Sequence, residues 1–194
     1  MSYMFFSCKA LTSLNVSNFD TANVTDMSSM FEYCEALTSL NVSSFDTTNV
    51  TDMSDMFYHC EALTSLNVSN FDTTNVTDMN SMFAYMSGNK NITIDISNFD
   101  MSNVTNTSYM FASSLKYTNN FIGTTDYNGI TTLKLPNLNM QDKSTNNNFF
   151  GTAPIVGTDI AKATIVVKNS TDSAWVREKL NIAYQSGSGT INIA

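Results

Sequence analysis

Charged residues are scarce in this sequence: Asp, Glu, Lys and Arg make up only 13% of its 194 residues, well under the usual share. The formal net charge is −8. A nucleic-acid-binding surface needs clustered Lys and Arg, so nucleic acid is not an expected partner. Long apolar runs are missing as well, so we do not expect membrane insertion. The opening residues, MSYMFFSCKA, do not show the charged and apolar regions of a signal peptide.

Cysteine is limited to Cys8, Cys34 and Cys60, which are spaced 26 residues apart. Equal spacing marks one position of a repeat, whereas metal sites usually contain closer pairs such as C-x2-C. The next repeat has Met86 in this position, which predicts a small buried apolar site. We therefore expect three reduced, stacked thiols, and neither a cofactor nor a metal.

What the sequence has in abundance is a nearly verbatim repeat of 26 residues. The fourth copy takes two extra residues around Gly88, and the fifth carries an insertion at about Lys116 to Gly129. The later copies are degenerate, as expected of terminal repeats. The copies start at Met4, Met30, Met56, Met82 and Met110, with a degenerate start at Phe149.

The first three copies contain the alternating stretch LTSLNVS, in which Leu14 and Val16 point to one side, and this predicts a short strand. One strand cannot bury its apolar side alone, so we expect the strands to stack into one parallel sheet with right-handed crossovers. The expected rungs are Leu14/Val16, Leu40/Val42, Leu66/Val68, Ile94/Ile96, Leu133/Leu135, Ile165/Val167 and Ile191/Ile193. L-x-x-L-x-V followed by a variable arc indicates a leucine-rich-repeat-type solenoid.

The second half of each copy has a different period. Met27, Met30, Phe31 and Cys34 lie at i, i+3, i+4 and i+7, which predicts one face of a short helical segment. Asp26 directly precedes it as the expected N-cap. The expected fold is thus a right-handed parallel β-solenoid with one short strand and one short helical segment per repeat.

The C-terminal part has the pattern of a cap. Residues 1–170 are the predicted solenoid, regular to about residue 111, and residues 171–194 are a predicted capping helix and strand. Thr171 or Asp172 should cap the helix, which should run to about Tyr184 and place Val176 against the last rung.

The N-terminal part opens inside a repeat, because Met1 aligns with Met27. The first strand would then have an unpaired edge, and such edges invite pairing with another chain. We therefore expect further repeats before this segment, and end-to-end self-association through its uncapped rim.

Candidate chemistry is limited. The only histidine, His59, has no identifiable nucleophile or acid partner, so we do not expect an enzyme. Aspartates recur in two positions of the repeat, and the favoured interpretation is bonding to local backbone N–H groups, with calcium as the alternative. These aspartates are Asp20, Asp46, Asp72 and Asp100 in one position, and Asp26, Asp52 and Asp78 in the other.

Polar residues that recur at equivalent positions of the predicted strands leave two interpretations open. Asn15, Asn41 and Asn67 recur between inward Leu and Val. They favour an amide ladder of stacked side chains, with a ligand-facing row as the alternative. Regularly spaced Thr and Ser also suggest the hypothesis of binding to an ice or crystal face. Such a face would need one outward Thr repeated on every strand, whereas the outward strand residues here are Ser and Asn.

Three positions of the repeat vary from copy to copy while the frame stays constant. They are Phe6/Glu32/Tyr58/Ala84, Ser7/Tyr33/His59/Tyr85 and Lys9/Glu35/Glu61/Ser87. Core positions tolerate little change, so these are predicted to lie at the surface, where aromatics suggest contact with a partner. The expected partner-binding residues are Phe6, Tyr33, Tyr58, His59 and Tyr85. That these positions are simply unconstrained is the alternative.

The unit LTSLNVSNFDTxNVTDMSxMFxxC, at 11–34 and 37–60 and partly at 63–86, resembles the BspA-like bacterial leucine-rich repeat surface proteins. The likeness is close over residues 1–111 and loose over 112–170. It implies a cell-surface or secreted location and adhesion to, or binding of, a protein on a host or neighbouring cell. It transfers no catalytic residues. A purely structural spacer in a larger surface protein is the alternative function.

Overall fold

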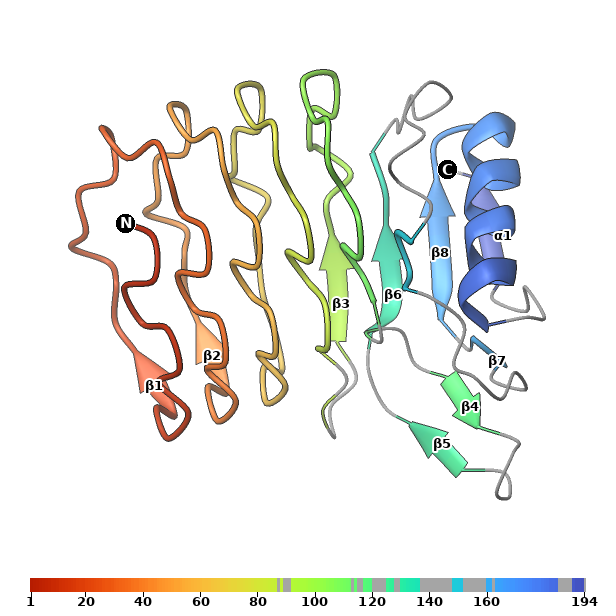
Figure 1. The fold of residues 1–194 in the computed structure, drawn as a ribbon, viewed down its shortest axis with the longest axis horizontal. Helices are drawn as coiled ribbons and strands as arrows, with labels where there is room; N and C mark the ends of the chain where they lie inside the picture. The colour runs from red at the N-terminus through yellow and green to blue at the C-terminus, as the bar shows by residue number, and fades with distance from the viewer. Residues whose placement is uncertain are drawn as a thin grey trace.

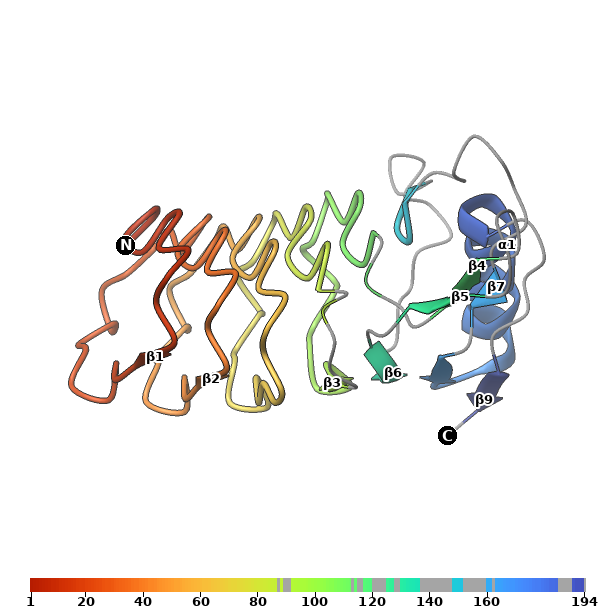
Figure 2. The same ribbon diagram turned by 90° about the horizontal axis from the view of Figure 1, so that it is seen from below.

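The computed structural model describes residues 1–86, 88, 92–112, 114, 117–119, 125–127, 130–136, 148–151, 160–161, 163–184 and 190–193. The regular elements among these residues are mostly short strands, in two parallel sheets and one antiparallel sheet, and successive repeats lie side by side in a stack (Figure 1). The arrangement is consistent with a repeat, solenoid-like fold. Figure 2 places β1, β2, β3 and β6 along one edge of the stack and winding turns along the opposite edge.

The parallel strands pair in the predicted register. β1 (Ser13–Leu14) pairs with β2 (Ser39–Leu40), with Leu14 opposite Leu40. A second sheet has the order β3 (Ile92–Asp95), β6 (Ile130–Lys134), β8 (Thr164–Val167) and β9 (Thr190–Ile193). Its aligned residues are Ile94, Leu133, Ile165 and Ile191. The rungs predicted from the repeat are therefore confirmed on both sides of the third copy.

One continuous sheet was the wrong prediction. Leu66 and Val68 of the third copy are buried as expected, but no strand is formed around them. The strand sequence is identical to that of the second copy, so the cause lies outside it. Close by, the Gly88 backbone approaches the Glu61 carbonyl, two residues before Leu63 of the third copy, so closely that a Cβ at Gly88 would overlap it.

A third, antiparallel sheet comes from the insertion in the fifth copy. β4 (Tyr117–Asn119) pairs with β5 (Thr125–Tyr127) and with β7 (Ile160–Ala161), both antiparallel. It lies near the C-terminal end of the stack (Figure 1).

The predicted helical segment is a series of β-turns instead. Every second backbone N–H closes a β-turn by donating to the carbonyl three residues earlier, as the Met30 N–H does to the Met27 carbonyl at 3.3 Å. The others donate to the next copy: Ser29 N–H reaches the Ser54 carbonyl at 2.8 Å. A helix would keep all these donors within the segment. To bond the next copy, the chain must depart from helical geometry at residues with a left-handed backbone, here Ser29 with φ of 54° and Tyr33 with φ of 58°.

The apolar side chains of these turns are buried as predicted, because i, i+3, i+4 and i+7 also fall on one side of consecutive turns. Met27, Met30, Phe31 and Cys34 have no exposed surface. The phenylalanines lie above one another with ring centroids 5.3–5.8 Å apart; the rings are stacked from Phe5 to Phe111, and the last pair, Phe111 and Phe149, is tilted by 56°. They are Phe5, Phe31, Phe57, Phe83, Phe111 and Phe149.

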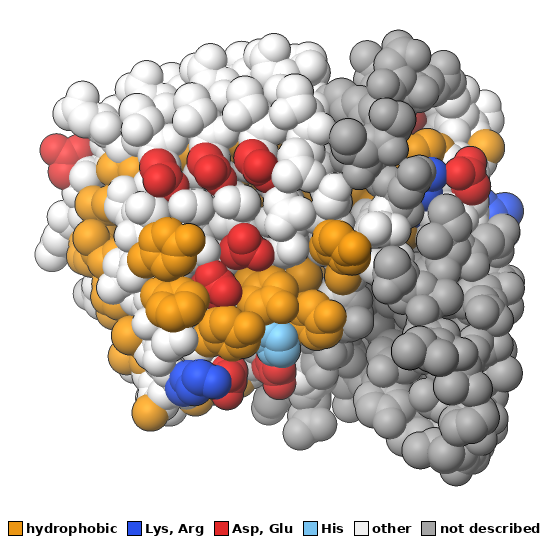
Figure 3. All heavy atoms as spheres, viewed as in Figure 1, with side chains coloured by type: hydrophobic (Ala, Val, Ile, Leu, Met, Phe, Trp, Pro, Cys, Tyr) orange, Lys and Arg blue, Asp and Glu red, His pale blue; other side chains and the backbone are white. Residues whose placement is uncertain are grey.

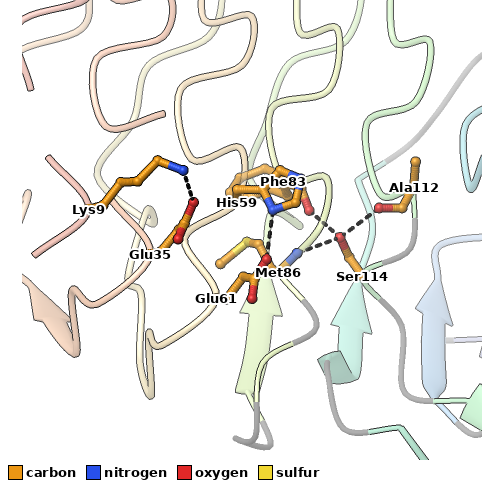
Figure 4. Close-up of polar contacts among 8 residues, drawn as sticks. All are labelled: Lys9, Glu35, His59, Glu61, Phe83, Met86, Ala112 and Ser114. Carbon is orange, nitrogen blue, oxygen red and sulfur yellow. Dashed lines mark hydrogen bonds and ion pairs between the residues drawn. The ribbon is translucent and has the colours of Figure 1, made fainter. Parts of the chain in front are cut away.

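The cysteine position is confirmed as one stacked position with free thiols, and it is more polar than predicted. Cys60 Sγ lies 3.2 Å from the Phe31 carbonyl, and Cys34 makes the same contact with Phe5. In the fifth copy the position holds Ser114, whose hydroxyl donates to the Phe83 carbonyl (Figure 4). The position therefore accepts a donor to the preceding copy in Cys34, Cys60 and Ser114, and the apolar Met86 in the fourth copy.

The aspartates make the predicted local bonds. The Asp46 carboxylate accepts the Thr48 N–H at 3.0 Å, and the Asp52 carboxylate accepts the Ser54 N–H at 2.8 Å. Asn41 does likewise: its side-chain oxygen accepts the Ser43 N–H at 3.0 Å. The amide ladder predicted for this position is thus replaced by a local turn, because the nearest backbone donor takes the oxygen. Cross-copy amide bonds come from another position, that of Asn49, Asn75 and Asn103.

The C-terminal helix α1 (Ser170–Tyr184) lies beside β8 at the end of the stack (Figure 1). Its N-cap is Asn169, not Thr171 or Asp172: the Asn169 side-chain oxygen accepts the Asp172 N–H at 2.8 Å. The Asn169 side-chain N–H in turn donates to the Asp172 carboxylate at 2.9 Å, so the earlier residue satisfies the helix start. Val176 is fully buried as predicted.

β9 follows α1 and pairs with β8, so a strand and a helix are present where a cap was expected; the domain boundary at residue 170 stays a prediction. Among the described residues, no helix is both long and apolar enough to cross a membrane.

Thiol labelling tests the cysteine position. Burial raises the pKa of Cys34 to about 11 and that of Cys60 well above its usual value, whereas Cys8 is only half-buried. A thiol reagent at mildly alkaline pH should label Cys8 quickly in the folded chain, and all three cysteines after unfolding. Fewer than three groups in the unfolded chain would contradict free thiols.

A buried threonine tests the cross-copy bonding. Thr47 is 2% exposed; its hydroxyl donates to the Asp72 carbonyl at 2.9 Å and accepts the Asp72 N–H at 2.8 Å. Thr47→Val leaves both groups unsatisfied, so the free energy of unfolding should fall by about 2 kcal/mol, measured by urea denaturation. Thr51→Val removes an exposed cross-copy bond that water can replace, so its effect should stay within about 0.5 kcal/mol. Equal losses in both variants would contradict the role given to burial.

Candidate functional site: an aromatic face on the turns

The winding turns carry the variable positions outward. Tyr33, His59 and Tyr85 all have left-handed φ, between 56° and 58°. Each donates its N–H to the following copy, as Tyr33 does to Tyr58 at 2.9 Å. Identical backbone geometry places the three side chains above one another, a repeat pitch apart.

All five predicted partner-binding residues meet in one cluster. The His59 ring is stacked between the rings of Tyr33 and Tyr85. The distances between ring centroids are 5.0 and 4.6 Å, and the interplanar angles are 19° and 4°. Tyr58 contacts both tyrosines edge-on at 5.4 and 5.3 Å. Phe6 contacts Tyr33 at 6.1 Å. His59 is therefore half-buried between two tyrosine rings. This packing is compatible with both interpretations of these positions, contact with a partner and simple lack of constraint.

Sequence reasoning missed one member. Tyr3 lies 5.6 Å from Phe6, and the two are 60% and 43% exposed. Tyr3 occupies the other left-handed position of the turn, which holds Ser or Asp in the next three copies, so its aromatic character was the available signal. We call Tyr3, Phe6, Tyr33, Tyr58, His59 and Tyr85 the aromatic face. Figure 3 shows hydrophobic side chains gathered around the single histidine, with acidic groups among and beside them.

One predicted surface position is buried. Ala84, aligned with Phe6 and Tyr58, has no exposed surface, because a methyl group is too short to emerge beyond its neighbours. Ser87 lies outside the described residues.

One ion pair and one histidine–carboxylate hydrogen bond border the aromatic face (Figure 4). Lys9 Nζ lies 2.7 Å from the Glu35 carboxylate and 5.2 Å from the centre of the Tyr33 ring. His59 Nδ1 lies 2.7 Å from the Glu61 carboxylate. The hydrogen bond with Glu35 raises the pKa of Lys9. Burial and neighbouring Tyr33 raise the pKa of Tyr58 to about 12, so this phenol stays neutral at physiological pH.

An unpaired carboxylate lies within the same face. Burial and the nearby Glu32 charge raise the pKa of Asp55 to about 6, while a hydrogen bond with Ser81 acts the other way. Asp78 and Asp52 add smaller repulsions. The group is therefore held in a crowded, acidic environment that favours its neutral form.

A second surface lies on the strand side. Two shallow hollows of about 470 and 340 Å³ share Leu40, Asn41 and Ser65, and so form one groove. Its polar lining is uncharged Asn, Ser and Thr. Since the Asn41 oxygen is used by the backbone, the groove offers amide and hydroxyl donors. The described residues contain no group of three His, Cys, Asp or Glu side chains placed to hold a metal.

Comparison with known proteins gives a family. Residues 1–125, and again 37–149, match the family described as Mycoplasma protein of unknown function, DUF285. The chain belongs to this family. The overlap of the two matches agrees with the internal repeat of the sequence. No curated protein and no solved structure matches the chain.

The pH dependence of stability tests the environment of Asp55. Its folded-state pKa of about 6 lies above the ordinary 3.8, so its ionisation destabilises the fold above about pH 6 and this penalty vanishes as pH falls toward 4. Asp55→Asn should raise the free energy of unfolding at pH 7 and change it little at pH 4, measured by urea denaturation. Asn tolerates the φ of 57° at this position.

Asp46→Asn is the control, because hydrogen bonds with Thr48 lower the pKa of Asp46. Its loss should not stabilise the chain at pH 7. An Asp55→Asn effect that is the same at pH 7 and pH 4 would contradict the raised pKa.

Proposed function

We propose that this chain is a non-catalytic protein-binding module that presents its aromatic face to a protein on a host or neighbouring cell. In this proposal the stack is a right-handed, leucine-rich-repeat-type solenoid similar to the BspA-like bacterial surface proteins. The module then acts at the cell surface or outside the cell.

The observation that carries the proposal is the continuity of six aromatic rings across four consecutive copies. Exposed aromatic residues are rare on soluble surfaces unless they take part in contacts. Tyrosine supplies a large contact area at a low cost in side-chain entropy and is enriched in binding hot spots. The stacked rings restrain one another, so little further ordering is needed when a partner binds.

The rigid backbone beneath the rings supports the same conclusion. Each turn is bonded to the next copy through its backbone, as Phe31 N–H is to the Met56 carbonyl at 3.0 Å. Buried phenylalanines stack directly below. A surface held in this way presents its side chains in a constant geometry, which favours specific recognition.

A binding screen tests the proposal. The intact chain should bind saturably to at least one protein of a panel of purified cell-surface and extracellular-matrix proteins, measured by surface plasmon resonance. The variant Tyr33→Asn, Tyr58→Ser, Tyr85→Asn should weaken this binding at least tenfold, since hot-spot aromatics each contribute about 2 kcal/mol. Asn suits the left-handed backbone of Tyr33 and Tyr85.

Ser39→Ala with Ser65→Ala is the matched control, because it alters the strand-side groove and leaves the aromatic face intact. Its binding should equal that of the original chain. Loss of binding in this control, with retention in the aromatic variant, would move the binding surface to the groove. A panel without any saturable binding would favour a structural spacer instead.

A further inference from the structure

The half of the chain that builds the aromatic face is strongly acidic. Between Met1 and Met86 the only Lys or Arg is Lys9. The same stretch contains ten carboxylates: Asp20, Asp26, Glu32, Glu35, Asp46, Asp52, Asp55, Glu61, Asp72 and Asp78. A partner that approaches this face therefore meets a negative potential, which attracts cationic groups.

The acidic groups on the face are unequally neutralised. Among the described residues of this face, Lys9 forms an ion pair with Glu35, and Glu61 is hydrogen-bonded to His59. Glu32 and Asp55 belong to neither contact. Backbone bonds from Ser29 to Ser54, at 2.8 Å, and from Phe31 to Met56, at 3.0 Å, hold their turns side by side, and the Glu32 charge acts on Asp55. Both are half-buried, and their positions directly precede Tyr33 and Met56 in turns that stack on one another.

The geometry points to a Lys- or Arg-bearing segment of the partner protein as the occupant of the aromatic face, with its cation between Glu32 and Asp55 and its stem against Tyr58 and Phe6. This inference rests on the proposed function. A guanidinium or ammonium group there would relieve the repulsion of the two carboxylates. It would also gain the attraction between a cation and an aromatic ring.

A neutral sugar fits the same face less well. Sugars bind by laying a ring on the open face of an aromatic side chain, but both faces of His59 are covered by Tyr33 and Tyr85. A neutral ligand would leave the charge of Glu32 and Asp55 uncompensated.

The test uses the whole chain and two synthetic peptides. One is a twelve-residue repeat of Arg-Gly-Ser, and the other has citrulline, which is uncharged and nearly the same shape, in place of Arg. Binding is measured by fluorescence anisotropy at about 0.15 M salt, where long-range charge effects are screened beyond roughly 8 Å. The Arg peptide should bind and the citrulline peptide should bind at least tenfold more weakly.

Two variants separate the site from overall charge. Glu32→Gln with Asp55→Asn should weaken binding of the Arg peptide at least tenfold. Asp46→Asn with Asp72→Asn removes the same charge from turns elsewhere, where Asn can still accept the Thr48 and Thr74 N–H groups, and should change binding less than threefold. Circular dichroism checks that both variants are folded.

Equal weakening in the two variants would overturn the inference, because attraction would then come from net charge alone. Absence of Arg-peptide binding, or equal binding of the two peptides, would overturn it too. Neither result decides the proposed function, which is tested by the protein panel: an aromatic face that binds a protein without requiring its cations would keep that function and remove only the cationic partner.

Discussion

The backbone hydrogen bonds between the turns of neighbouring copies are the interaction on which the rest of the structure depends. Every second N–H of a turn leaves its own copy, as in Phe31 to Met56 and Tyr33 to Tyr58. This needs non-glycine residues in the left-handed region, at a cost of about 1 kcal/mol each. The same positions repeat this conformation in successive copies. The bonds and the burial of Met and Phe beneath them offset that cost.

The same constraint explains the character of the aromatic face. Because the backbone repeats with a constant pitch, side chains at equivalent positions must accept one another as neighbours. Apolar side chains do so inside, as in the phenylalanine stack. Outside, rings can stack, as Tyr33, His59 and Tyr85 do, whereas equal charges at equivalent positions repel, as Asp46 and Asp100 repel Asp72. Because equivalent positions of successive copies lie next to one another, single residue differences between copies together form a continuous surface of rings and charges.

Much of the fold followed from the repeat itself. Alternation at Leu14 and Val16 predicted the strand, and constant spacing predicted its register with Leu40. The five aromatic positions were found because they vary within a constant frame. The turns were predicted as a helix because apolar residues at i, i+3, i+4 and i+7 fall on one side of both a helix and a series of β-turns. The residue types at Ser29 and Tyr33 do not indicate a left-handed φ.

Other misses have local causes. The third copy's strand position has the same sequence as the second, so the sequence pattern could not predict that a strand forms in only one of them. Asn169 was passed over as a cap because two good candidates follow it. The amide ladder failed because a side-chain oxygen bonds the nearest donor, two residues away. Such choices depend on three-dimensional neighbours that a single sequence does not state.

The direction of the cross-copy bonds gives the stack a polarity. In the turns the donors belong to the earlier copy, as with Met27 and Asp52, but in the threonine ranks they belong to the later one, as with Thr51 and Thr25. The surface by which a copy contacts its neighbour therefore has backbone donors along one segment and backbone acceptors along another. A copy turned upside down would oppose donor to donor at equivalent positions. Only a copy in the same orientation can extend the array, so the backbone itself specifies the order in which repeats can be joined.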